Sequence, residues 1–440
     1  MSAGANTSVF RSNVKWQIAS SAGQAILSGL VLLILGRFLS AGGFGHYSII
    51  MSFVIVANLS MEPRMQDVVA RHFWNFGDDA DTREQHREHF VDFLIFEVTA
   101  KLLPCIALIA LAIPIARMVD MPAGSHWLIG IAALGNYFTK FAFGLSTGLL
   151  RVLGRSDMFA LCVNGELIVR LAVLAALALS GHLTVTTSIV TFALTGTLAN
   201  AVQLVLATSQ VPRVSQTLRD WQPRAALVRL RPHRRLLLSN IGLSGSDLMN
   251  KDLDIAMLSP VMPAEQIGVY KMAKSVAQLA WRTIDPFTLA LMPEISRRIA
   301  MGEYRSTRSL LRRSAIALAV LTACIAAAGY FGLVFFGTQL FGEEFASIPS
   351  LTIWMLIGVV IGAPLVWGHP LAVALNRADL PFIGNLLSLV VGLGSFVVLV
   401  SLFGIVGAAI AWAMTFVPFF VFTSAAAFRL FKKREAQAQQ

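Results

Sequence analysis

Apolar stretches long enough to cross a lipid bilayer recur along the whole chain, and they constrain its fold more than any other feature. Roughly 18–25 apolar residues in a helix cover the hydrocarbon core of a membrane. Only 13% of the 440 residues are charged, which is too little polar surface for a soluble domain of this length. We predict an all-α membrane protein of about twelve transmembrane helices, at residues 16–39, 45–63, 91–116, 124–149, 157–180, 186–209, 236–259, 265–292, 312–336, 349–374, 380–402 and 404–428.

The first apolar stretch and the cysteines fit this interpretation. The stretch is too long for a signal-peptide core, and no clear small-residue cleavage pattern follows it, so we expect a retained helix. Cys105, Cys162 and Cys324 all fall inside apolar stretches. They are expected to pack as small hydrophobic residues and not to form a disulfide framework.

The formal net charge of +11 suggests nucleic-acid binding until its distribution is considered. Lysines and arginines gather before the first predicted helix and after the second, fourth, sixth, eighth, tenth and last. The intervening loops at 181–185, 259–266 and 337–345 contain none. By the positive-inside rule this predicts a multi-pass protein of the bacterial inner (cytoplasmic) membrane with both termini in the cytoplasm. The basic loops are also suited to anionic lipid headgroups.

The sequence contains an internal repeat at an offset of about 223 residues. Matching pairs in the same order are Phe44–Tyr47 with Ile267–Tyr270, Leu153–Asp157 with Leu375–Asp379, and Gly181 with Gly404. We predict two six-helix lobes related by a pseudo-two-fold axis along the membrane normal, a plan found in transporters with a central site. The lobes are expected at 1–210 and 236–440, the second ending in a basic cytoplasmic tail, with a basic cytoplasmic linker at 211–235.

Ionisable residues inside the predicted helices indicate a polar interior, because charges at membrane depth usually face protein or a wet cavity. On the eighth helix one arc of roughly 80° holds Lys271, Lys274, Gln278, Arg282 and Asp285. The seventh helix carries a second polar face with Asn240, Ser244, Asp247, Lys251 and Asp254.

The N-terminal half has a smaller polar set. Asn136, Lys140 and Thr147 share a face of the fourth helix, and Glu97–Lys101 and Glu166–Arg170 have the i,i+4 spacing of ion pairs. A water-filled cationic cavity would suit an anionic substrate, since Lys and Arg bind phosphate. The alternative is that these groups pair with one another and hold helices together. Asp247 and Asp254 either bind a coupling ion, H⁺ or Na⁺, or neutralise lysines opposite.

Several chemistries lack their sequence signature. There is no P-loop, so no ATP is expected to drive the chain directly, and no histidine or cysteine cluster has metal-ligand spacing. We predict neither a cofactor nor a metal site. Every predicted outer loop is too short for a catalytic domain, so we do not expect an enzyme.

The order and spacing of several motifs resemble the polysaccharide and O-antigen (Wzx-like) flippases of the multidrug/oligosaccharidyl-lipid/polysaccharide exporter superfamily, over nearly the whole chain. The motifs are Gly36–Leu39 with Gly43–Ser48, Leu150–Asp157, Asp252–Asp254 with Gly268–Ala273 and Leu291–Ser296, Phe341–Phe345, and Gly404–Ala411. Ser40, Ala41 and Gly42 replace the more usual Gly-Pro of the family's first loop.

The resemblance implies movement of a polyprenyl-diphosphate-linked oligosaccharide from the cytoplasmic to the periplasmic leaflet. It further implies alternating access, an ion gradient as the energy source and, as possible partners, polysaccharide assembly proteins. In this sequence the expected diphosphate-binding residues are Lys271, Lys274, Arg282, Lys140 and Lys251, and the ion-coupling candidates are Asp247 and Asp254.

Other functions remain open from sequence. A drug or metabolite antiporter of the same superfamily is the first, although exporters of cations favour acidic cavities. A membrane polysaccharide polymerase or ligase handles the same lipid-linked sugars but usually needs a long periplasmic loop. A scaffold within a polysaccharide assembly complex is the third.

Overall fold

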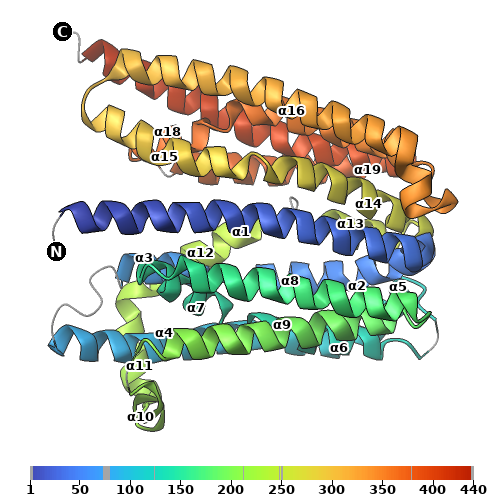
Figure 1. The fold of residues 1–440 in the computed structure, drawn as a ribbon, viewed down its shortest axis with the longest axis horizontal. Helices are drawn as coiled ribbons and strands as arrows, with labels where there is room; N and C mark the ends of the chain where they lie inside the picture. Colours follow the sequence, from blue (N-terminus) through green and yellow to red (C-terminus); the bar gives the residue numbers. More distant parts are fainter. Residues whose placement is uncertain are drawn as a thin grey trace. The chain divides into compact units, whose positions relative to one another are not determined.

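The computed structural model describes residues 3–72, 80–122, 124–211, 213–246, 248, 251–377 and 379–437, and every regular element in these ranges is a helix (Figure 1). The all-α prediction is therefore confirmed. Contacts divide the chain into two compact units. The first unit comprises Met1–Ile34 and Ile50–Gly245, and the second comprises Leu35–Ile49 and Ser246–Gln440. The turn between the first two helices thus packs with C-terminal residues.

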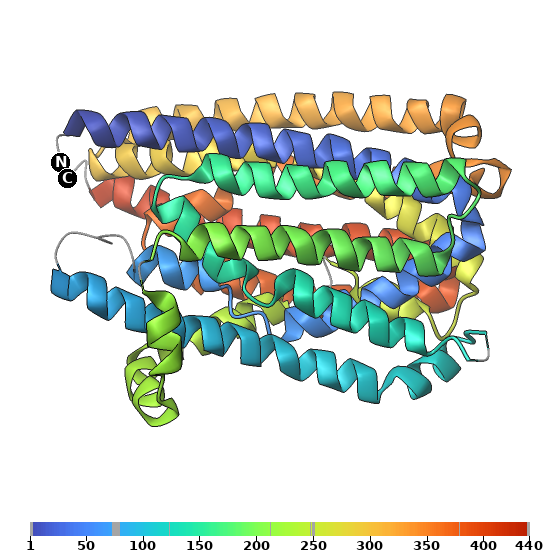
Figure 2. The same ribbon diagram turned by 60° about the horizontal axis from the view of Figure 1, so that its bottom comes forward.

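The first unit is a bundle of long apolar helices with short interruptions. Its elements are α1 (Ala3–Phe38), α2 (Ser40–Ser60), α3 (Met65–His72), α4 (Ala80–Ala110), α5 (Ala112–Met118), α6 (Trp127–Lys140), α7 (Phe143–Val152), α8 (Ser156–Leu179), α9 (Val185–Thr208), α10 (Val214–Arg219), α11 (Pro223–Leu230), η1 (Arg231–His233) and α12 (Arg234–Ser246). The end of α1 and the beginning of α2, together with the last residue of α12, belong to the second unit. Within it α9 packs between α6 and α8, α4 packs on α6, and α3 packs on α7 (Figure 2). Both α6 and α7 also pack against α9.

A buried carboxylate fastens the basic segment of α10 and α11 to α4. Asp92 on α4 is only 1% exposed. It accepts hydrogen bonds from Trp221 Nε1 at 3.0 Å and from Arg229 Nε at 2.5 Å. These bonds to Asp92 raise the pKa of the Arg229 guanidinium. This segment is thus docked on the end of α4.

The second unit contains the longest helices. Its elements are α13 (Leu253–Leu258), α14 (Ala264–Arg282), α15 (Asp285–Ala300), α16 (Tyr304–Phe341), η2 (Glu343–Phe345), α17 (Ile348–Gly362), η3 (Ala363–Leu365), α18 (Gly368–Ala374) and α19 (Asp379–Gln437). The helix α19 is bent at Gly404, whose φ is 58°. Within this unit α17 packs against α14, α16 and α19, which places it at the centre of the packing.

The backbone repeats the pattern found in the sequence. Non-helical residues with positive φ occur in pairs about 222 residues apart: Asp120 with Gly342, Gly154 with Asn376, and Gly181 with Gly404. The second and third pairs lie in turns that the sequence repeat predicts. The first is an additional match in the sign of φ alone, because the φ values of Asp120 and Gly342 are 48° and 103° and the residue types differ. The two halves therefore place positive-φ residues at equivalent positions.

The beginnings of α2 and α14 make a reciprocal contact inside the second unit. A Cβ atom at Gly45 would overlap the backbone carbonyl of Ala264, and one at Gly268 would overlap the carbonyl of Ala41. Ala41 and Gly45 are the repeat equivalents of Ala264 and Gly268. Such an exchange of equivalent contacts is what a two-fold relation between the repeats requires. Glycine is needed at both positions because the two backbones approach so closely.

Nine helical segments in the described part of the chain are long and apolar enough to cross a membrane. One of them, Asp379–Gln437, contains two of the predicted spans joined across the Gly404 kink. The predicted spans at 236–259 and 265–292 are not among the nine. The first is interrupted between α12, which ends at Ser246, and α13, which begins at Leu253. The second is interrupted between α14 and α15, and Pro286 lies in the first turn of α15, where proline is favoured because no helical N–H is needed there. The count of twelve stays a prediction.

Candidate functional site

A buried charge network in the second unit joins α13 to α14. Asp254 and Lys274 are both 0% exposed, and Lys274 Nζ lies 2.7 Å from Asp254 Oδ1. Tyr270 donates its hydroxyl proton to the other oxygen, Asp254 Oδ2, at 2.5 Å. Desolvating two charges costs several kcal/mol unless each is paired and hydrogen-bonded. Both conditions are met here, so the network fixes α13 against α14.

Asp252 extends this network toward solvent and was not expected from the sequence as a site residue. Its Oδ1 lies 2.7 Å from Lys271 Nζ and 3.3 Å from Lys274 Nζ. The Lys271 side chain is 20% exposed, whereas that of Asp252 is 8% exposed. Lys274 also donates to the backbone carbonyl of Lys251. Two carboxylates therefore balance two lysines, and the predicted excess of positive charge on α14 is reduced.

The remaining predicted residues of this unit are differently placed. Arg282, at the end of α14, is exposed and has no hydrogen-bond or ion-pair partner among the described side chains. Lys251 is exposed as well, and its side chain has none within the described part either. Asp247 lies outside the described residues. The cations of α14 thus fall into a buried, neutralised pair near its middle and an exposed arginine at its C-terminus.

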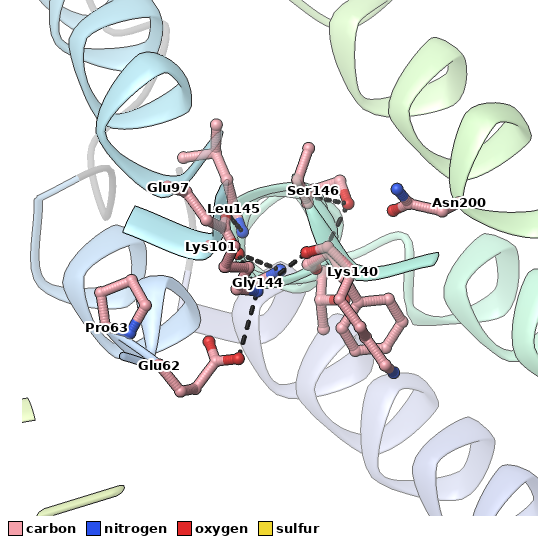
Figure 3. Close-up of polar contacts among 12 residues, drawn as sticks. Glu62, Pro63, Glu97, Lys101, Lys140, Gly144, Leu145, Ser146 and Asn200 are labelled. Carbon is pink, nitrogen blue, oxygen red and sulfur yellow. Dashed lines mark hydrogen bonds and ion pairs between the residues drawn. The ribbon is translucent and has the colours of Figure 1, made fainter. Parts of the chain in front are cut away.

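In the first unit, the predicted pair Glu97–Lys101 on α4 is confirmed, with Lys101 Nζ 2.8 Å from Glu97 Oε1. Glu97 also accepts hydrogen bonds from the backbone amides of Gly144 and Leu145, each at 2.9 Å (Figure 3). These amides belong to the first turn of α7. A carboxylate at a helix N-terminus satisfies unpaired N–H groups and interacts favourably with the helix dipole. Glu97 is therefore the cap of α7.

Lys101 caps the C-terminal end of α6, which precedes the same break. Its Nζ donates to the backbone carbonyl of Lys140, the last residue of α6, at 2.8 Å. Cations are favourable at helix C-termini for the same electrostatic reason that anions are favourable at N-termini. Lys101 also lies 3.2 Å from Glu62, so it stands between two carboxylates (Figure 3). One i,i+4 pair on α4 thus caps both ends of the break between α6 and α7.

The break separates residues that the sequence placed on one helical face. Lys140 precedes it, and its ammonium lies 3.9 Å from the centre of the Phe143 ring. Thr147 follows it and accepts a hydrogen bond from Gln203 on α9 at 2.9 Å. The prediction that Asn136, Lys140 and Thr147 share a continuous helix face is therefore wrong. No ion pair of Lys140 is found among the described residues, so it is the cation of this region without a carboxylate in contact.

The second predicted pair of this unit, Glu166 with Arg170 on α8, is also confirmed as an ion pair. Thr195 on α9 donates to Glu166 at 3.3 Å. The Arg170 guanidinium lies over the Phe192 ring, 4.4 Å from its centre. These contacts bind α8 to α9. They support the interpretation of this pair as a connection between helices.

The described residues contain no group of three or more His, Cys, Asp or Glu side chains able to hold a metal ion. The acidic and basic side chains described above instead form short networks that connect helices. Such networks are the usual form of ionisable groups inside membranes.

Comparison of the sequence with protein families finds a match over most of the chain. The profile described as "Polysaccharide biosynthesis protein" matches residues 34–344. The probable low-salt glycan biosynthesis flippase Agl15 of Haloferax volcanii is 25% identical over 169 residues, which cover 37% of this chain and 35% of that protein. The chain thus spans about a third of this curated relative.

Comparison of the structure finds the same fold in solved transporters. A multidrug resistance MATE family transporter of the MOP superfamily, in an inward-facing conformation, has a TM-score of 0.69 at 14% identity, covering 94% of this chain and 95% of the other. Lipid II flippase MurJ, in an inward closed conformation, has a TM-score of 0.66 at 12% identity, covering 97% and 90%. The Vibrio cholerae MATE transporter VcmN in the bent form has a TM-score of 0.59 at 14% identity, covering 98% and 99%.

Proposed function

We propose that this chain, a multi-pass membrane protein that belongs to the polysaccharide biosynthesis protein family, is a flippase for a lipid-linked glycan. The substrate we infer is a polyprenyl-diphosphate-linked oligosaccharide, moved from the cytoplasmic to the periplasmic leaflet by alternating access. The observation that carries the proposal is the family match over residues 34–344. The fold adds support because it is shared with transporters and flippases, which are not enzymes.

The proposed orientation of the chain in the membrane rests on the distribution of basic residues. Arginine-rich segments adjoin the ends of alternate predicted spans, and the positive-inside rule assigns those ends to the cytoplasm of a bacterial inner membrane. With this orientation both termini are cytoplasmic. Two reporters can be fused to the C-terminus, one active only in the cytoplasm and one active only in the periplasm. We expect activity from the first, and activity from the second would contradict the orientation.

The proposed diphosphate ligands differ in how ready they are to bind. Arg282 and Lys251 are exposed, and Lys140 contacts a ring rather than a carboxylate, so these three can receive a phosphate directly. Lys271 must first exchange Asp252 for the phosphate, which its partial exposure permits. Lys274 is buried between two aspartates and contributes only if α13 and α14 separate.

This exchange gives a physical route to ion coupling. A proton or Na⁺ bound at Asp252 or Asp254 would cancel a negative charge and release a lysine for the diphosphate. Asp254 is one of the predicted coupling residues, and Asp247 remains the other candidate. Loss of the cation would restore the aspartate–lysine contacts and disfavour the anion. Ion binding and substrate binding would then be linked, because each would change the affinity for the other.

The test is flipping in proteoliposomes. A fluorescent polyprenyl-diphosphate oligosaccharide is reconstituted with the wild type, with Lys271→Ala, with Arg282→Ala and with Arg305→Ala as an exposed control outside the network. We expect transport by the wild type and the control. Loss of one charged hydrogen bond to phosphate is expected to slow transport about tenfold or more in the first two variants.

The alternatives give different outcomes. If the wild type moves no lipid-linked sugar but exchanges small organic solutes for an ion, the chain is an antiporter. If glycan chains are lengthened or transferred, it is a polymerase or ligase. Equal transport by all variants would remove Lys271 and Arg282 from the binding site while leaving the flippase function in place.

A further inference from the structure

A cavity of about 640 Å³ lies in the second unit, at the end where α2, α14 and α17 begin. Its volume falls within the roughly 300–1,000 Å³ typical of small-molecule sites. The turn that bends α19 at Gly404 closes one side through Ile405 and Val406. The elements around it are the loops between predicted spans that carry no basic residue. The cavity therefore lies at the end of the unit that faces away from the cytoplasm in the proposed orientation.

Among the described residues that line this cavity, two carry a carboxylate and none carries a basic side chain. Glu265 belongs to the first turn of α14 and is exposed, with no hydrogen bond or ion pair in the described part of the structure. Glu344 accepts a hydrogen bond from the backbone amide of Ala41 at 2.6 Å and leaves its other oxygen available. The negative charge excludes a diphosphate from this cavity. The ligand must be neutral or cationic.

The rest of the lining supplies short polar groups beside an apolar surface. Gln266, Ser347 and Ser350 offer amide and hydroxyl groups that both donate and accept. Val269 and Leu351 provide apolar contacts next to them. Sugars have the complementary composition, because their hydroxyl groups donate to carboxylates and their C–H faces are apolar.

From the cavity, its acidic rim and its mixed lining we propose that it binds sugar residues of the glycan, which rests on the proposed flippase function. Along α14, Glu265 and Arg282 are separated by roughly 25 Å at the usual rise per residue. One helix thus carries an acidic pocket at its start and an exposed cation at its end. The proposed substrate has matching parts, a neutral glycan and an anionic diphosphate.

The test compares two lipids in proteoliposomes: the full polyprenyl-diphosphate oligosaccharide and the same lipid trimmed to a single sugar. The variants are Glu265→Gln, Glu344→Gln and, as a matched control, Glu303→Gln, an exposed glutamate that precedes α16 and does not line the cavity. The first two are expected to slow transport of the full glycan about tenfold, since a hydrogen bond to a charged acceptor is lost. Transport of the trimmed lipid and the behaviour of the control should equal wild type.

The remaining outcomes separate this inference from the flippase function. Wild-type transport of both lipids with unchanged rates in the two cavity variants would overturn the sugar site alone. Equal slowing of both lipids would assign the glutamates to stability and also overturn it. No wild-type transport of either lipid would overturn the flippase function. Binding of the free oligosaccharide to the purified protein, weakened by Glu265→Gln, would support the site, whereas a phospholipid adduct lost in that variant would identify a lipid headgroup site instead.

Discussion

Lys101→Met tests whether the ion pair on α4 supports the break between α6 and α7. The substitution keeps most of the side-chain volume and removes the charge. Lys101 is 2% exposed and Glu97 is 0% exposed, so the variant leaves a buried carboxylate without its cation. Glu62, 3.2 Å from Lys101, loses its partner too.

The magnitude follows from the burial. Breaking a buried ion pair by removing one partner costs about 3–5 kcal/mol, because the remaining charge is uncompensated. The carbonyl of Lys140 also loses a donor, which adds about 1 kcal/mol. For a unit of this size 1 kcal/mol corresponds to about 2–4 °C, so we expect the unfolding temperature to fall by roughly 8–24 °C.

The assay is thermal unfolding in detergent, followed by intrinsic fluorescence, for the wild type, Lys101→Met, Glu97→Gln and the double variant. Lys433→Met, an exposed lysine near the C-terminus, is the control. The double variant should recover most of the loss, because a neutral amide can still accept from Gly144 or Leu145 and the fully buried carboxylate is gone. Glu62, whose side chain is 19% exposed, is the only one of the three charged groups that remains. An unchanged unfolding temperature in Lys101→Met, or a double variant less stable than both single variants, would refute the capping argument.

Three further predictions concern other parts of the chain. Gly45→Ala and Gly268→Ala should each lower the free energy of unfolding by about 1–3 kcal/mol and by similar amounts, because their contacts are reciprocal; a large difference in unfolding midpoints would contradict the two-fold relation. Asp92→Asn should loosen α11 by removing the charged partner of Arg229, seen as faster trypsin cleavage in that segment with no change in the helical content by circular dichroism. Burial lowers the pKa of His233, so the folded state favours the neutral imidazole. The free energy of unfolding should therefore fall as the pH drops below about 6.5, where the unfolded chain binds a proton more readily. His233→Gln should weaken this dependence of the unfolding midpoint on pH.

Much of the fold was predictable because it depends on patterns visible along one chain. The apolar stretches predict helices, and the i,i+4 spacing of Glu97 with Lys101 predicts their ion pair. The repeat at Gly154 and Asn376 predicts equivalent turns, and both residues have positive φ. In each case the determining residues are neighbours in sequence or occupy equivalent places in the two halves.

The missed features depend on contacts between separate helices. Asp252 faces Lys271 across the space between α13 and α14, and no spacing on a single helix reveals that pairing. The break after Lys140 has no proline at its position, and it persists because Glu97 caps the helix that follows. Hydrophobic periodicity cannot distinguish one span from two shorter helices when both halves are apolar. Because Asp252 and Asp254 lie outside α14, a count of charges on α14 alone overstated its free positive charge.

The reciprocal contact between the starts of α2 and α14 has an evolutionary consequence. A half-length ancestor with an alanine and a glycine at this spacing would carry both surfaces of the contact. It could close on a second copy of itself without any new residue. Joining the two copies into one chain would keep the contact and free each copy to change elsewhere.

The present residues show such divergence. At the repeat equivalents of Lys271 and Lys274 stand Ser48 and Met51, and at the equivalent of Glu265 stands Gly42. The N-terminal copy has small or apolar groups at these positions, whereas the C-terminal copy has the acidic start and the lysines of α14. A duplicated scaffold with one symmetric contact would thus be chemically different in its two halves, which is what the proposed substrate, with a neutral and an anionic part, would require.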